Sequence, residues 1–149
     1  MGFKKTTYKN NACFFIFLED VTIFDINGAI ARMLWKEISL WNKEKNEFNI
    51  VVWGSNTLSG EILRTGLQMN LFSKKQKIKY CYVTDNRNFI IRHSELNLMN
   101  GDELSYLDYK NPESWDAVSK ADIIIVSDVL DVETMQTLVV KAGESMIYY

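Results

Sequence analysis

The sequence predicts an α/β protein with a doubly wound, mostly parallel Rossmann-like sheet and an extra N-terminal strand and helix. Strand-like apolar runs alternate along the 149 residues with segments whose apolar side chains recur at helical spacing. Several runs are continuously apolar, which is typical of strands buried on both faces of a parallel sheet. Right-handed crossovers between such strands place helices on both faces of the sheet. The length favours a single domain.

Residues 1–47 are predicted to precede the core. Residues 1–11 are polar and basic, so we expect a frayed or disordered start. Residues 12–18 predict a strand buried on both faces, followed by a helix that Asp25 caps. The apolar stripe of this helix is expected to comprise Ile26, Ile30, Met33, Leu34, Ile38 and Trp41. Residues 12–47 are therefore predicted to add a strand and helix at one sheet edge or to supply a dimer contact.

Residues 48–149 are predicted to form the nucleotide-binding core of a single domain that spans residues 12–149. Strands are expected at residues 48–53, 77–83, 104–109, 122–126 and 145–149. Helices are expected over 58–69, after Pro112 and over 131–142, while 89–98 is ambiguous and favours a helix. Asn111 before Pro112 indicates a helix start, and Gly143 indicates a helix end. Because the last strand has no tail after it, we expect the domain to belong to a larger protein.

Composition argues against several classes of protein. The net charge of −2 and a single short basic run, Lys74 to Lys79, give no basic face for nucleic acid. The two cysteines, Cys13 and Cys81, and one histidine are too few for a structural zinc site, and we expect buried, reduced thiols in a cytoplasmic protein. Residues 12–18 are too short to cross a bilayer, which takes about 20 residues, so no direct membrane insertion is predicted.

The loop after the strand at 48–53 is the main candidate site. A helix N-terminus presents unpaired amides and a partial positive charge, and it can therefore hold a phosphate. The dinucleotide fingerprint GxGxxG maps onto Gly54, Asn56 and Ser59, so only its first glycine is present. The predicted phosphate-binding residues are Gly54, Ser55, Asn56, Thr57, Leu58 and Ser59. The alternative is a strand–helix turn that holds no ligand.

Two further segments are expected at the same edge of the sheet. Asp85, at the end of the strand at 77–83, is placed to accept hydrogen bonds from ribose hydroxyls, and it favours a free 2′-hydroxyl over a 2′-phosphate. Asp85 with Asn86 could instead form only a turn. Arg87 and Arg92 follow and could contact phosphate. Ser127 and Asp128 are expected across the switch point from the loop, where Ser127 either contacts a ligand or caps the next helix.

Residues 50–60, 83–86 and 121–128 together resemble the Trk-type NAD-binding domain of potassium-transport regulators, the N-terminal lobe of the regulator-of-conductance (RCK) family. The resemblance covers about residues 48–149. It implies a domain that senses NAD(H), ATP or a related nucleotide, forms dimers or rings, and passes a conformational change to a membrane channel or another domain of its parent protein. The chain also looks similar to bacterial proteins that join such a domain to a ryanodine-receptor-like repeat. Asn56 and Ser59 depart from the family's glycine fingerprint, and residues 12–45 have no counterpart in its minimal lobe.

We predict that the protein is not an enzyme. Tyr106 and Lys110 have the spacing of the short-chain dehydrogenase pair, but they precede Pro112 instead of lying on a late helix. His93 is the only histidine, and it has no partner at a recognisable spacing. Two alternatives to a regulatory nucleotide-binding domain stay open. One is a ligand-free interaction or dimerisation domain that uses tryptophans such as Trp35, Trp41 and Trp115, and the other is an NAD-dependent oxidoreductase.

Overall fold

The computed structural model of the chain describes residues 4–7, 13–16, 25–86 and 101–149, with side chains for the last two ranges. The predicted helix at 89–98, Arg87, Arg92 and His93 lie outside the described residues. None of the helices in the described ranges combines the length and the apolar composition needed to cross a bilayer.

The core of the fold is a five-stranded, all-parallel sheet with the strand order β5-β4-β3-β6-β7. The strands are β3 (Glu47–Trp53), β4 (Lys77–Val83), β5 (Glu103–Leu107), β6 (Ile123–Val126) and β7 (Met146–Tyr148). The chain runs outward from β3 to β5 and then returns to the other side of β3 to form β6 and β7. The predicted Rossmann-like α/β class is therefore confirmed, and the switch point lies between β3 and β6.

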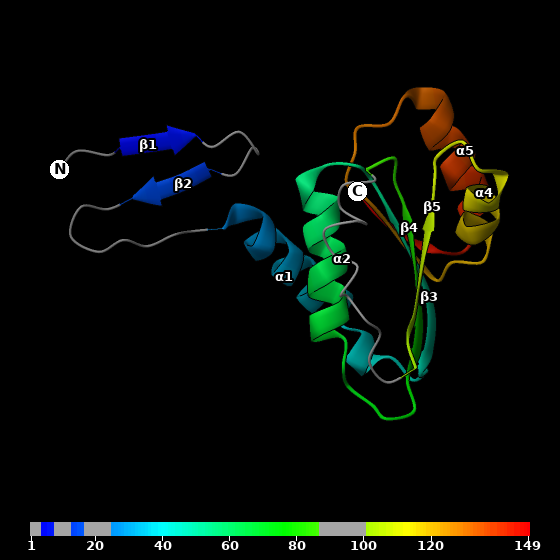
Figure 1. The fold of residues 1–149 in the computed structure, drawn as a ribbon. Coiled ribbons are helices and arrows are strands. Elements are labelled where there is room, and N and C mark those ends of the chain that lie inside the picture. Colours follow the sequence, from blue (N-terminus) through cyan, green and yellow to red (C-terminus); the bar gives the residue numbers. More distant parts are fainter. Residues whose placement is uncertain (1–3, 8–12, 17–24, 87–100) are drawn as a thin grey trace.

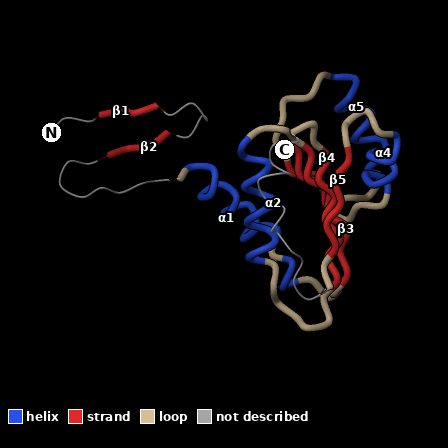
Figure 2. The backbone as a smooth tube through the Cα atoms, in the orientation of Figure 1, coloured by secondary structure: helices blue, strands red, loops and turns tan. Residues whose placement is uncertain are grey.

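Helices cover both faces of this sheet (Figures 1 and 2). On one side lie α1 (Ile26–Ile38) and α2 (Thr57–Met69), and on the other lie α4 (Pro112–Ser119) and α5 (Val132–Ala142). Two apolar cores result, because successive side chains of a strand point to opposite faces. Ile50 and Val52 of β3 join the core under α1 and α2, whereas Val51 and Trp53 join the core under α4 and α5.

The predicted helix boundaries follow the capping residues. Asp25 accepts a hydrogen bond from the Gly28 amide at 3.1 Å, and Asn111 accepts one from the Glu113 amide at 3.0 Å. Gly143 ends α5 with a φ of 57°, a conformation that favours glycine. These local signals confirm the helix starts at Asp25 and Asn111 and the helix end at Gly143.

The buried face of α1 differs from the predicted stripe. Ala31, Trp35 and Ile38 are buried, whereas Ile30, Met33 and Trp41 are exposed. Trp35 decides this rotation of the helix, because its indole fills the space beside Gly66 of α2 and donates from Nε1 to the Ile62 carbonyl at 2.8 Å. Trp41 is not part of α1, since Ser39 adopts a left-handed conformation and a separate 3₁₀ helix, η1, follows at Leu40–Asn42.

The N-terminal strand does not extend the parallel sheet as predicted. Strand β2 (Cys13–Ile16) pairs with β1 (Lys4–Thr7) in a separate antiparallel sheet, with Lys4 opposite Ile16. Residues 4–7 are thus a strand, although a frayed segment was expected. The short separation of the two segments gives a physical reason, because closing a small loop costs less entropy than reaching a distant sheet edge.

Candidate functional site

The predicted site segments meet at the carboxyl ends of β3, β4 and β6. The Gly54 amide donates to the Val83 carbonyl at 3.0 Å, and the Ser127 amide donates to the Trp53 carbonyl at 3.0 Å. Both bonds continue the strand ladders into the loops. Residues 54–59, 84–86 and 127–128, which we call the carboxyl corner, consequently form one connected cluster, as a parallel sheet requires.

Gly54 permits the closest approach in the carboxyl corner. A Cβ atom at this position would lie 2.3 Å from Ser127 Oγ and 3.0 Å from Ser59 Cβ. Such distances are well inside normal contact, so a side chain here would force β6 and α2 away from the loop. The first glycine of the fingerprint therefore has a packing role that the structure makes explicit.

The Asn56 side chain is used within the protein. Its Oδ1 accepts from the Ser59 amide at 2.8 Å and thereby caps α2, and its Nδ2 donates to the Ser127 carbonyl at 2.6 Å. Asn56 was predicted as a donor to phosphate, but both of its polar atoms already have partners. The residue that replaces the second fingerprint glycine ties the start of α2 to the end of β6.

Ser59 is also a structural residue. Its side chain is fully buried, and its Oγ donates to the Asn56 carbonyl at 2.7 Å and lies 2.8 Å from the Tyr82 hydroxyl. The predicted contact between the Ser59 hydroxyl and a phosphate is therefore not possible in this arrangement. Burial raises the pKa of Tyr82, so that phenol stays protonated beside Ser59.

Asp128 places a carboxylate inside the carboxyl corner. Its Oδ2 accepts from the Ser55 amide at 2.7 Å and from the Tyr109 hydroxyl at 2.7 Å. One of the amides that was predicted to face a ligand anion is thus already bonded to an anion of the protein itself. Asp128 is half-buried and is bonded to Ser55, which lies 73 positions away in the chain.

Tyr109 is a site residue that the sequence analysis did not single out. Its hydroxyl lies 2.7 Å from Ser55 Oγ and donates to Asp128. Burial raises the pKa of Tyr109, and the Asp128 and Asp85 carboxylates raise it further, against the opposing effect of its bond with Ser55. The sequence feature that could have identified Tyr109 is its position. It follows β5 by two residues and therefore lies at the same edge of the sheet as the other loops.

Asp85 and Asn86 lie beside the glycine loop, as predicted. The Asp85 amide donates to Ser55 Oγ at 3.1 Å, and Asn86 Nδ2 donates to the Ser55 carbonyl at 3.2 Å. The Asn86 amide also donates to Thr84 Oγ1 at 3.0 Å, so the turn interpretation holds as well. Asp85 is exposed, and within the described ranges no hydrogen bond or ion pair engages its carboxylate.

Two backbone amides at the start of α2 are open to a ligand. Thr57 and Leu58 occupy the first turn, where an amide has no acceptor within its own helix, and no described residue accepts from them. The Leu58 side chain packs against the core, so only its backbone faces the corner. Ser127 does not cap the following helix, since Asp131 does so by accepting from the Thr134 amide at 2.8 Å.

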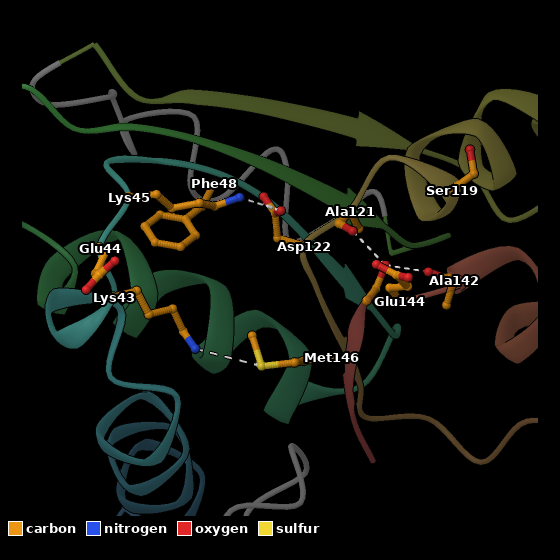
Figure 3. Close-up of a pocket in the computed structure, with 11 residues that line it drawn as sticks. Lys43, Glu44, Lys45, Phe48, Ser119, Ala121, Asp122, Ala142, Glu144 and Met146 are labelled. Carbon is orange, nitrogen blue, oxygen red and sulfur yellow. Dashed lines mark hydrogen bonds and ion pairs between the residues drawn. The ribbon is translucent and has the colours of Figure 1, made fainter.

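A separate hollow of about 600 Å³ lies at the opposite, amino edge of the sheet (Figure 3). Within it, Lys45 Nζ pairs with Asp122 Oδ1 at 2.5 Å and lies 5.1 Å from the centre of the Phe48 ring. The Lys43 amine reaches toward the Met146 sulfur at 3.8 Å. Lysines and carboxylates are mixed along its walls, so its charge favours no single ligand class.

The remaining sequence candidates that the structure describes do not form a second constellation. Tyr106 lies on β5 and not on a helix, which removes the structural context of the dehydrogenase pair. Cys81 is buried and forms no disulfide with another described residue, and burial raises the pKa of its thiol. No group of three or more potential metal ligands occurs within the described part of the chain.

Comparison with known proteins adds no family assignment. No protein-family model matches the sequence, and no curated protein matches it either. The resemblance to the RCK lobe thus stays a prediction.

Proposed function

We propose that this chain is a regulatory domain that binds NAD(H) or a related adenine nucleotide at the carboxyl corner and catalyses no reaction itself. The observation that carries the proposal is the bond between the Asp85 amide and Ser55 Oγ, at 3.1 Å. It holds an exposed carboxylate, which no other described residue engages, beside the first turn of α2, whose Thr57 and Leu58 amides have no acceptor among the described residues. A carboxylate that can accept hydrogen bonds from ribose hydroxyls, next to amides that can donate to phosphate at the switch point of the sheet, is an arrangement that suits a nucleotide.

Asp128 sharpens the choice of ligand. Its carboxylate already accepts the hydrogen bond of the Ser55 amide, and it repels further negative charge in the carboxyl corner. The two phosphates of a dinucleotide each carry about one negative charge, whereas the three phosphates of ATP together carry about four negative charges. The Thr57 and Leu58 amides would hold a phosphodiester, and Asp85 would hold the ribose hydroxyls. We therefore favour NAD(H) over ATP, in a cytoplasmic domain of a larger protein that also contains an effector such as a channel.

Thermal unfolding with added nucleotide tests this proposal. NAD at about ten times its dissociation constant would add about 1.4 kcal/mol to the unfolding free energy, a rise of roughly 3–6 °C in Tm. We expect NAD or NADH to give this rise and ATP a smaller one. Asp85→Asn should reduce the NAD effect, while Asp116→Asn, on an exposed position of α4, should preserve it. The absence of any shift at millimolar NAD, NADH or ATP would refute nucleotide binding.

A second candidate is an interaction or dimerisation domain without a ligand. The outer side of α5 favours it, because Val132, Val139 and Val140 are all exposed, Val140 by 79%. Sedimentation as a function of protein concentration distinguishes the two candidates. Association that Val140→Lys abolishes, together with no nucleotide-induced shift, would support the second.

A further inference from the structure

A cavity of about 310 Å³ opens next to the carboxyl corner, on the face of the sheet that α4 and α5 cover. Its aromatic lining consists of Trp53 at the end of β3, which is only 2% exposed, and of the more accessible Tyr109 after β5 and Trp115 on α4. The Trp53 ring stacks on Tyr109 with centres 5.6 Å apart, and it meets Trp115 with centres 4.9 Å apart. The walls are thus held in place by one another, and the volume suits a small ligand.

The two charged residues that line this cavity within the described part of the chain are both acidic. Asp128 and Asp131 contribute the carboxylates, and among the residues that the structure describes no lysine or arginine lines the cavity. Neither carboxylate takes part in an ion pair with another described residue. Asp128 is half-buried, and among the described residues its carboxylate accepts from the Ser55 amide and the Tyr109 hydroxyl. A negative, aromatic cavity favours a cation with an apolar surface.

We propose that this cavity binds a small methylated ammonium compound. The methyl groups of such a cation pack against aromatic rings, and its charge is attracted by the rings and by the two carboxylates. A bare metal ion fits less well, because hard cations need several oxygen ligands and most of these walls are carbon. The cavity uses neither Asp85 nor the amides of α2, but it shares Asp128 with the carboxyl corner, so it lies directly beside the proposed nucleotide site.

Tryptophan fluorescence gives a direct test, since two of the four tryptophans line the cavity. We would titrate the unaltered chain with choline chloride against sodium chloride of equal ionic strength. The control ligand is 3,3-dimethyl-1-butanol, which has the shape of choline without its charge. We expect a saturable change with choline and at least about tenfold weaker binding of the neutral compound, the factor that corresponds to about 1.4 kcal/mol. No saturable change, or equal binding of both compounds, overturns the proposal.

Matched tryptophan variants locate the effect. Trp115→Leu should weaken choline binding about tenfold, while Trp41→Leu, at an exposed position of η1, should leave it unchanged. Equal behaviour of the two variants contradicts the assignment to this cavity. If circular dichroism shows that Trp115→Leu does not fold, the comparison of choline with 3,3-dimethyl-1-butanol on the unaltered chain tests the proposal by itself.

Two acidic positions separate this proposal from nucleotide binding. Asp131→Asn removes a negative charge from the cavity, so it should lower choline affinity. The amide oxygen of the new side chain can still cap α5, so little structure should be lost. Asp85→Asn should leave choline binding unchanged while it reduces the response to NAD. Loss of choline binding in Asp85→Asn would show that the cation binds elsewhere, whereas loss of the NAD response alone leaves the cavity assignment intact.

Discussion

Replacing Asp128 tests the geometry of the carboxyl corner most directly. Asp128→Ala leaves the Ser55 amide and the Tyr109 hydroxyl without their shared acceptor. Each hydrogen bond to a charged acceptor contributes about 1.5–3 kcal/mol when it is buried. Asp128 is only half-buried, and water can reach part of the site, so we expect the lower end. The expected loss of unfolding free energy is therefore about 3 kcal/mol for the two bonds together.

Asp128→Asn is the matched control for this loss. An amide oxygen at the same position can still accept from both donors, so we expect a cost of about 1 kcal/mol or less. The variant also removes the negative charge from the corner. If the nucleotide proposal is right, Asp128→Asn should raise the affinity for NAD(H), and it should raise the affinity for ATP more.

Urea unfolding at pH 7 measures these differences, and a double-mutant cycle isolates the pairwise term. Tyr109→Phe removes the phenol hydroxyl that Asp128 accepts from. The cycle of Asp128→Ala with Tyr109→Phe should give a coupling energy of about 1 kcal/mol. A loss below about 0.5 kcal/mol in Asp128→Ala, or a coupling energy near zero, would contradict the bonding in the corner, since surface changes are usually this small.

Three further predictions concern stability and affinity. Gly66→Ala should lower the unfolding free energy in urea by about 1–2 kcal/mol, because its Cβ would meet Trp35 Cζ2 at 2.5 Å and overpacking outweighs the gain of about 1 kcal/mol in helix propensity. A stabilised variant would show that the indole does not fill that space. Burial raises the pKa of Tyr80 in the folded state, so stability is fully present below the unfolded pKa of about 10 and falls as the pH rises above it. Tyr80→Phe should flatten that decline between pH 9 and 11, and an unchanged slope would disprove the assignment. Asn56→Gly should lose both the bond to the Ser127 carbonyl and the side-chain cap on the Ser59 amide, at a cost of about 1–2 kcal/mol in unfolding free energy. It should tighten NAD binding in a fluorescence titration, and weaker NAD binding would count against the proposed site.

Local sequence signals determined most of the secondary structure. Strand β4 begins and ends at the predicted residues, because Lys77 and Lys79 alternate with the apolar residues that start the strand and an apolar and aromatic run, residues 80–83, completes it. Asn111 before Pro112 marks the start of α4 by a side-chain cap that acts within two residues. The strand–helix alternation was enough to predict the parallel sheet and to bring Gly54, Asp85 and Asp128 to one edge.

The contents of the carboxyl corner were decided only by tertiary structure. The Ser55 amide and Asp128 are 73 residues apart, and no periodicity relates them, yet their bond changes the charge that a ligand would meet. Tyr109 entered the corner for the same reason. On α1, the spacing favoured a stripe through Ile30 and Met33, whereas Trp35 is buried against Gly66 and those two residues are exposed. Capping and periodicity act over a few residues, whereas side-chain packing and charge placement depend on distances that exist only after the chain has folded.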